Sequence, residues 1–311
     1  MFEFFAGGSF PLCGERTESQ GGCVLGICTE QGMKAFAEPN GTDIIHIEYE
    51  DSGIIEMEIG DSEPRAEEAE TPAALVRGIM NCFIESGNIF GGFNAKIVSE
   101  IPQGCKISSE AAFEVLIGKI ISGLFFENTV PPMTLAKFGS IAENNYFGRP
   151  CGISNQLISA VGGLVFADFS DPDMPEYTEI DFDFGKSGHT LALVENGEMD
   201  EDSSDGEKEM AFVAWNMGYT FLSEVEEAEF IAQFPILRQK CGEKAVMQAL
   251  RFYEERRKAE EEAKTLETGD FAGFCGIYES PEEKLKIVPE EKAGAFAEEM
   301  EKQGFGVMFL L

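Results

Sequence analysis

The chain has 311 residues, of which 43% are hydrophobic, and 57 acidic residues against 23 basic ones give it a net charge of −34. This length and hydrophobicity suit a globular chain with a packed core in one large or two medium domains. The negative charge repels a phosphate backbone, which argues against nucleic acid as a partner. Lys119 and Glu127 interrupt the longest apolar run before it reaches the length of a membrane span, and the start of the chain lacks the basic flank of a targeting segment. We therefore expect a cytoplasmic protein with no membrane partner.

The eight cysteines are scattered along the chain and form no Cys-x-x-Cys pair. A chain of this length does not depend on disulfides for its core, so we expect reduced thiols that are mostly buried. Cys23, Cys28 and His46 leave a metal site as an alternative, although their spacing fits no zinc pattern.

The first third of the chain reads as strands and one helix. Gly7-Gly8 predicts a turn, and a polar loop leads from Gly14 to Gly22 into an apolar strand. Alternation of apolar and polar residues predicts further half-buried strands. The predicted elements are the strands 23–27, 33–37, 44–59 and 93–98 and the helix 73–86.

In the stretch from Ile101 to Gly118, a Pro-Gly turn runs into paired serines and then into an apolar, alanine-rich helix. Ser108 or Ser109 is expected to cap this helix, whose unpaired first-turn amides and positive dipole end suit a phosphate. Two details oppose anion binding. Glu110 places a carboxylate where a phosphate would sit, and only Gly104 lets the backbone approach a ligand closely. An ordinary capped core helix is the alternative interpretation.

Residues 113–125 are apolar nearly all round, which predicts a central buried helix that anchors this loop. A second helix is predicted over residues 134–146, with Thr134 as a good starting cap and Glu143 late on its face. Residues 151–156 are expected to form a turn.

The remainder of the chain contains a predicted domain seam and further regular elements. They are the strands 164–169 and 190–194, the seam near 181–184, and the helices 226–231 and 245–266.

The acidic run from Glu195 to Glu209 is expected to be a solvated loop. A calcium loop is the sharper alternative. It fails on spacing, because Asp205 and Gly206 come one place late and no glutamate closes the loop.

A family resemblance is carried jointly by AGGSFPLCGERTESQGGCVL (6–25), GGFNAKI (91–97), IPQGCKISSEAAFEVLIG (101–118), AENNYFGRPCGISNQLISAVGGLVFADF (142–169) and RQKCGEKAVMQALRF (238–252). The chain resembles a galactokinase, of the galactokinase, homoserine, mevalonate and phosphomevalonate kinase superfamily. The resemblance implies an α+β, two-domain sugar-kinase fold of the galactokinase and mevalonate kinase type, with a ligand cleft between the domains. It implies an N-terminal kinase-type domain with a phosphate-loop-like segment over 1–185 and a shortened C-terminal domain over 186–311.

The reaction that this family carries out is phosphorylation of the anomeric hydroxyl of galactose by Mg-ATP. The resemblance therefore implies ATP and Mg as cofactors, and a galactose-like monosaccharide and a nucleotide as ligands. We expect a monomer or a weak oligomer.

Carried over one at a time, the family's catalytic positions are substituted here. Ser9 stands where the family has an arginine that steadies the nucleophile and the transferring phosphate. Asn155 stands where the family has an aspartate that is the base or the electrostatic partner of the sugar hydroxyl. A hydroxyl and an amide replace neither charge. Glu15 and Glu18 match the sugar-gripping pattern, with the carboxylate of Glu18 one methylene further out.

The family's phosphate loop corresponds here to the positions Gly104, Lys106, Ser108 and Ser109, and Glu110 follows where the family has another serine. Glu143 matches the family's magnesium-contacting glutamate. The Gly-rich third motif, which backs the phosphate site in the family, is missing between the segments YESPEEKLKI and VPEEKAGAFAEEM.

These departures predict a pseudoenzyme, a galactokinase-like chain that retains the fold and binds a sugar, a nucleotide or a protein partner without turnover. The alternative is an active sugar kinase with a rearranged site, in which Lys106 serves the phosphates and Glu18 or Glu110 acts as base or magnesium ligand. A decayed gene product without a selected role is a third hypothesis.

Overall fold

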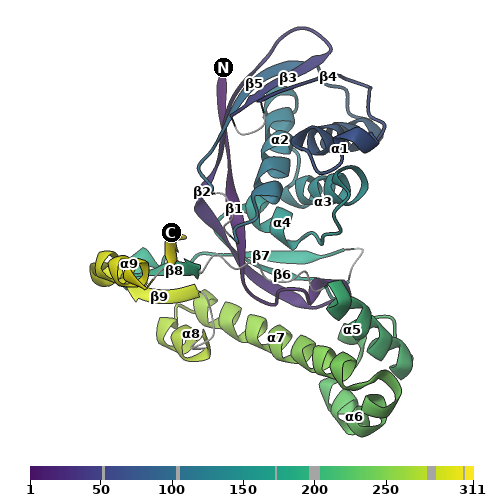
Figure 1. Ribbon diagram of the computed structural model, residues 1–311, viewed down its shortest axis with the longest axis vertical. Helices are drawn as coiled ribbons and strands as arrows, with labels where there is room; N and C mark the ends of the chain where they lie inside the picture. The colour runs from purple at the N-terminus through teal and green to yellow at the C-terminus, as the bar shows by residue number, and fades with distance from the viewer. Residues whose placement is uncertain (51–52, 103–105, 172–173, 196–203, 279–284, 304) are drawn as a thin grey trace. The chain divides into compact units, whose positions relative to one another are not determined.

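The computed structural model describes the chain apart from the short segments 51–52, 103–105, 172–173, 196–203, 279–284 and 304 (Figure 1). Contacts between residues divide it into two compact units. The first unit consists of residues 1–10 and 28–162, and the second consists of residues 11–27 and 163–311. The predicted domain boundary at residue 185 stays a prediction.

The first unit contains most of a mixed sheet, although the end of β1 (Phe2–Cys13) and the start of β2 (Cys23–Pro39) belong to the second unit. The other strands of the first unit are β3 (Ile44–Tyr49), β4 (Gly53–Glu58) and β5 (Phe93–Ser99). β3 pairs antiparallel with β4 and parallel with β5, while the second half of β2 pairs antiparallel with β5. The register aligns Ile47 with Ile55 on one side and Ala95 on the other, so buried side chains share one face.

The predicted turn at Gly7-Gly8 is wrong, because β1 runs straight through both glycines. A Cβ on Gly7 would lie 2.4 Å from both Cys28 Sγ and the Thr29 carbonyl oxygen, and one on Gly8 would lie 2.0 Å from Ile107. The glycines therefore permit close approach of neighbouring segments within the first unit, not a reversal of the chain.

Helices pack against one side of this sheet (Figure 1). They are α1 (Pro72–Glu85), α2 (Ser109–Phe125), α3 (Pro132–Ala142) and α4 (Ser154–Val161). α2 is buried nearly all round, as its apolar sequence predicts, and the ring of Phe113 stacks on Tyr49 at 5.2 Å between centroids.

The starts of α3 and α4 differ from the predictions. α3 begins at Pro132, so Thr134 lies inside its first turn and is not its cap, because a proline at the first position already has the helical φ. The predicted turn over residues 151–156 is replaced from Ser154 onward by α4.

In the second unit, the start of β2 pairs antiparallel with β6 (Leu164–Asp168), which pairs with β7 (Glu176–Ile180). A smaller sheet has the order β10-β8-β9 and is formed by β8 (His189–Glu195), β9 (Leu285–Pro289) and β10 (Gly306–Phe309).

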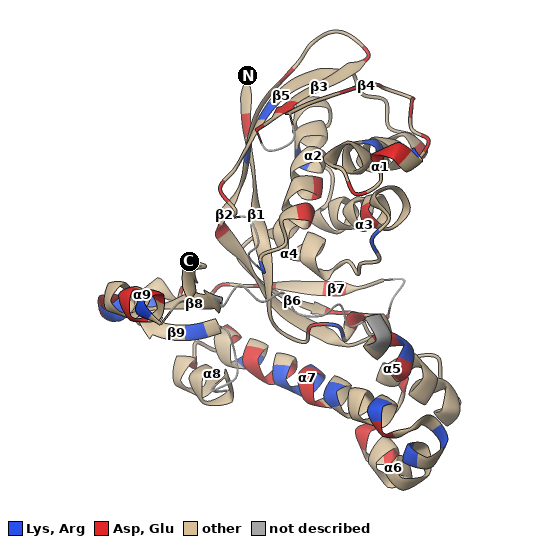
Figure 2. Ribbon diagram, in the orientation of Figure 1, with Lys and Arg blue, Asp and Glu red and all other residues tan. Residues whose placement is uncertain are grey.

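The helices of the second unit are α5 (Ser204–Met217), α6 (Glu227–Cys241), α7 (Glu243–Glu267), α8 (Phe271–Tyr278) and α9 (Ala293–Lys302). α5, α6 and α7 enclose a core that includes Val213, Phe230 and Phe252. Acidic and basic side chains alternate along α7 (Figure 2), in accord with the opposite-charge spacing of its sequence. None of the helices in the described part of the chain is long and apolar enough to cross a membrane.

Candidate functional site

Ser9 and Asn155, which the resemblance predicts to be substituted catalytic positions, lie together in the first unit. Ser9 belongs to β1 and is fully buried, and Asn155 lies in the first turn of α4. The Ser9 hydroxyl donates a hydrogen bond to Asn155 Oδ1 at 3.1 Å. Two residues that are 146 positions apart in the sequence thus form one neutral polar pair, with no charge on either side chain.

The N-terminus of α2 lies beside Ser9. Ser108 is the N-cap residue, and its backbone N–H donates to the Ser9 carbonyl oxygen at 3.1 Å. The Ser108 side chain makes no capping hydrogen bond, so the predicted side-chain cap at this position is wrong. The backbone pairing of Ser108 with β1 fixes the start of the helix in its place.

A carboxylate from the chain itself lies in the first turn of α2. Glu110 Oε2 accepts a hydrogen bond from the Ser109 hydroxyl at 2.9 Å, and Glu110 Oε1 accepts one from Arg149 Nη1 at 3.0 Å. The Arg149 guanidinium also lies over the ring of Phe147, 5.2 Å from its centroid. An anion is stabilised near the positive end of a helix dipole. The Glu110 carboxylate supplies that negative charge at the start of α2, where a phosphate could otherwise bind.

The remaining predicted phosphate positions are described only in part. Gly104 lies outside the described residues. Lys106 is half-buried and precedes the N-cap of α2 by two positions.

Glu143, the predicted metal ligand, begins a π-helical turn that ends at Phe147. Its carboxylate is buried and belongs to a pair with Glu114 of α2. Gln156 Nε2 donates to Glu143 Oε2 at 2.9 Å and to Glu114 Oε2 at 3.0 Å. Glu114 Oε1 is buried and has no hydrogen-bond partner among the described residues.

Burial determines the acidity of this pair. Burial raises the pKa of Glu114 well above its usual value, and the neighbouring charge of Glu143 raises it further. Burial likewise raises the pKa of Glu143. The pKa of the adjacent Cys151 thiol is also raised, by burial first and by Glu143 second. The cluster therefore favours protonated, neutral groups.

No group of three or more His, Cys, Asp or Glu side chains is placed to hold a metal ion within the described ranges. The predicted role of Glu143 as a metal ligand stays a prediction, as does the magnesium that the resemblance implies.

Glu15 and Glu18, the predicted sugar-binding residues, lie in the second unit on the loop between β1 and β2. The Glu15 side chain is largely exposed, and its nearest ion-pair contact is Arg16 at 3.8 Å. Arg16 has a φ of 68°, which a non-glycine residue rarely adopts. Glu18 is half-buried and starts a short 3-10 turn.

Residues 74–163 match the family model described as GHMP kinases N terminal domain. The galactokinase of Exiguobacterium sibiricum is 28% identical over 239 residues, which cover 73% of this chain and 60% of the relative. The crystal structure of Lactococcus lactis galactokinase complexed with galactose has a TM-score of 0.79 at 19% identity, covering 99% of this chain and 92% of that one. Methanococcus jannaschii mevalonate kinase has a TM-score of 0.61 at 13% identity, covering 99% of this chain and 97% of that one.

Residues 74–163 form a GHMP kinase N-terminal domain, and the chain is similar to galactokinases in sequence and in fold. The predicted family and the mixed helix-and-sheet fold class are confirmed. This galactokinase-like chain spans 60% of the length of the Exiguobacterium relative, so its own activity and ligands are proposals.

Sequence reasoning on the galactokinase-like chain missed two polar contacts of the first unit. The partner of Glu110 is Arg149, which is 39 positions away and therefore gives no local pattern. Glu114 carried a signal, because it is an acidic residue inside the otherwise apolar stretch 111–118 of α2.

Proposed function

We propose that this galactokinase-like chain retains the kinase fold but does not transfer phosphate from ATP to a sugar at an ordinary rate. The Ser9–Asn155 hydrogen bond carries this proposal. The resemblance gives these positions to an arginine and an aspartate, whose charges act on the transferring phosphate and on the sugar hydroxyl. A neutral pair that satisfies itself supplies neither a proton acceptor nor a positive charge.

The start of α2 supports the same proposal. Glu110 accepts bonds from Ser109 and Arg149 at the place where the resemblance puts the phosphates of ATP. A triphosphate would have to displace this carboxylate or accept its repulsion at close range. Weak or absent binding of Mg-ATP follows.

The buried acids are a third support. The magnesium role that the resemblance gives to Glu143 requires an ionised carboxylate with a free oxygen. Its Oε2 is bonded to Gln156, and burial beside Glu114 raises its pKa. A galactose-like monosaccharide at Glu15 and Glu18 remains the ligand that we propose for this chain, which we expect to be cytoplasmic and a monomer or weak oligomer.

The test is phosphate transfer from Mg-ATP to a panel of monosaccharides, followed by ³¹P nuclear magnetic resonance. An active galactokinase in the same buffer is the positive control. We expect no sugar phosphate from this chain with any sugar of the panel. A sugar phosphate formed at ~1 per second, an ordinary rate for kinases, would establish the alternative of an active kinase with a rearranged site, and Lys106, Glu110 and Glu18 would be the residues to replace first.

A further inference from the structure

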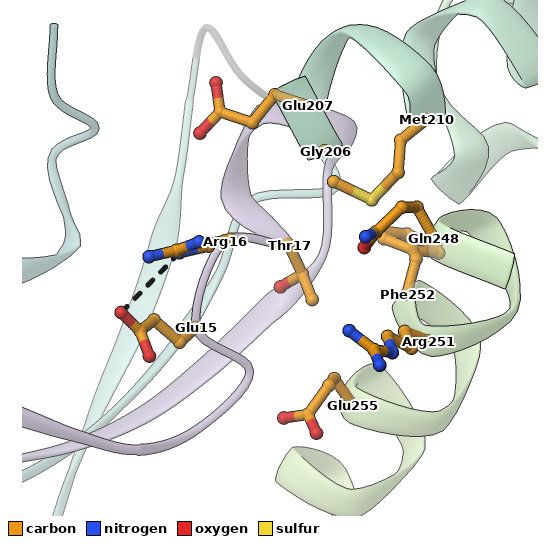
Figure 3. Close-up of a pocket in the computed structure, with 10 residues that line it drawn as sticks. All are labelled: Glu15, Arg16, Thr17, Gly206, Glu207, Met210, Gln248, Arg251, Phe252 and Glu255. Carbon is orange, nitrogen blue, oxygen red and sulfur yellow. Dashed lines mark ion pairs between the residues drawn. The ribbon is translucent and has the colours of Figure 1, made fainter. Parts of the chain in front are cut away.

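A pocket of about 390 Å³ lies in the second unit, between the loop that follows β1 and the helices α5 and α7 (Figure 3). Small-molecule sites in proteins have volumes of about 300–1,000 Å³. Its floor is apolar, since Met210 and Phe252 are 5% and 1% exposed. Apart from Glu15, the pocket uses none of the residues on which the proposed function rests.

One face of α7 supplies polar groups to this pocket. Gln248, Arg251, Phe252 and Glu255 follow the spacing i, i+3, i+4, i+7, which places them on the same side of a helix. Gln248, Arg251 and Glu255 extend from α7 toward the loop (Figure 3). A polar face turned toward another segment is unusual for a helix whose neighbouring turns pack an apolar core.

Arg251 has no ion-pair partner among the described residues, although the chain carries 57 acidic residues. The ion pair drawn in the pocket joins Arg16 to Glu15, on the far side of the loop (Figure 3). Gln248 also makes no hydrogen bond within the described chain. A guanidinium and an amide thus face the pocket together with their donors unused.

Glu255 connects the pocket to the loop. Its Oε2 accepts a hydrogen bond from the Gly14 backbone N–H at 2.9 Å. Gly14 has a φ of 80°, and a Cβ there would lie 1.9 Å from the Cys23 carbonyl oxygen, so the loop has little freedom at this point. The second oxygen of Glu255 can accept a bond from a hydroxyl or ammonium group of a ligand.

We propose that this pocket binds a small organic acid with one carboxylate and adjacent hydroxyl or ammonium donors. The carboxylate is held by the Arg251 guanidinium with help from the Gln248 amide, and the donors are held by Glu255. Glu15 and Glu207 also line the pocket, and their charges oppose a dianionic or polyphosphate ligand. Because Glu255 also holds Gly14, the bound acid stabilises the loop that carries Glu15 and Glu18.

The experiment is isothermal titration of the full chain with two matched pairs of probes. D-gluconate is compared with D-sorbitol, and L-serine is compared with serinol, because each partner differs from its acid only by a hydroxymethyl group in place of the carboxylate. We expect at least one acid to bind more than tenfold more tightly than its partner without the carboxylate. Gluconate alone identifies a hydroxy acid as the ligand class, and serine alone identifies an amino acid.

Variants locate the binding. Arg251→Gln should lower the affinity for the acid more than tenfold. Arg251→Lys should lower it less, because lysine keeps the positive charge but lacks the planar guanidinium. Arg257→Gln is the matched control, since Arg257 lies on the same helix and pairs with Glu227 at 2.8 Å outside the pocket. Its binding should equal that of the parent. If Arg251→Gln does not fold, Gln248→Ala replaces it as the test variant and is expected to lower the affinity for the acid about threefold.

Three results would overturn the proposal. The first is the absence of binding heat for both acids, when each is added from 20-fold excess over the chain up to its solubility limit. The second is equal affinity, in both pairs, for the acid and its partner without the carboxylate. The third is equal loss of affinity in Arg251→Gln and Arg257→Gln, which would mean a general effect of charge.

Discussion

At the residue scale, the buried acids Glu114 and Glu143 make the stability of the folded chain depend on pH. Each carboxylate accepts one bond from the same amide of Gln156, and Glu114 is fully buried. Ionising both buried carboxylates beside a single amide group costs free energy. The pair therefore retains protons in the folded chain at pH values where the unfolded chain releases them.

Glu114→Gln is predicted to reduce the loss of stability with rising pH. An acid whose pKa is raised by folding contributes its full share of stability below its pKa in the unfolded chain, which is about 4.3. That share is lost as the pH rises through its pKa in the folded chain. The pKa values of Glu114 and Glu143 are both raised. The parent should therefore lose stability between about pH 4.5 and pH 8, and the variant, which has one acid fewer, should lose less. Denaturant midpoints at the two pH values measure the difference.

Glu254→Gln is the control for this prediction, because Glu254 is an exposed acid on α7. It should keep the pH dependence of the parent. A parent whose denaturant midpoint rises from acid to neutral pH would contradict the assignment of raised pKa values to the pair.

The residue scale also shows where sequence reasoning succeeds and where it stops. Ser9 and Asn155 were found because each stands in a recognisable motif. Their direct hydrogen bond required the fold, since 146 positions separate them. The bond of Arg149 to Glu110 was not predicted, because nothing local in the chain requires a charge at either end.

At the element scale, the long uniform helices were predicted and the interrupted ones were not. α2 and α7 lie within a few residues of their predicted bounds, because their patterns are continuous over several turns. α6 runs on through Pro235 to Cys241, whereas the prediction stopped at residue 231. Tertiary packing of Phe230 and Leu237 against the core retains the helix across the proline.

The glycines of β1 give an element-scale prediction. Gly7→Ala should lower the free energy of unfolding by about 1–3 kcal/mol, the usual effect of overpacking, because a Cβ there meets the Thr29 backbone. Gly294→Ala is the matched control, since the space around Gly294 in α9 is open. It should be neutral or raise stability by up to about 1 kcal/mol. Equal melting temperatures for Gly7→Ala and the parent would show that β1 does not pack as described.

The start of α2 gives a second prediction at this scale. Glu110→Ser should strengthen binding of Mg-ATP, because it removes the carboxylate that accepts bonds from Ser109 and Arg149 and leaves the guanidinium free. Thermal shift with millimolar Mg-ATP measures this for the parent and the variant. The control is Glu85→Ser, at the exposed end of α1, which should behave like the parent. A stabilisation of the parent by about 2.7 kcal/mol, the value for ligand at ~100 times its Kd, would contradict the prediction.

At the scale of the whole molecule, the proposed loss of phosphate transfer leaves the kinase fold intact. The family resemblance lies in apolar and glycine-rich segments, which determine packing, and the comparison with solved kinases covers nearly the entire chain. At Ser9 and Asn155 the departures replace residues that the resemblance implies to be charged, and such substitutions contribute little to packing. A net charge of −34 adds a general repulsion of phosphate to the local repulsion proposed for Glu110.

The final prediction concerns catalysis by the whole chain. With galactose and Mg-ATP, the chain should form no galactose-1-phosphate above background, and Asn155→Asp alone should not restore it. The aspartate would return a proton acceptor, but Ser9 would still lack the positive charge for the transferring phosphate, and Glu110 would still oppose the nucleotide. An arginine at such a position contributes about 10³–10⁵ in rate in other enzymes. Catalytic groups that act as a unit do not add, so one restored group should leave the rate at background.

The measurement is galactose-1-phosphate formed by the parent, by Asn155→Asp and by Asn155→Asp combined with Glu110→Ser, each checked for an unchanged melting temperature. Product from Asn155→Asp alone at more than 1% of an ordinary kinase rate of ~1 per second would mean that Asn155 is the sole defect. Ser9 and the acid at the start of α2 would then be tolerated substitutions, and the chain would be a kinase one residue away from activity.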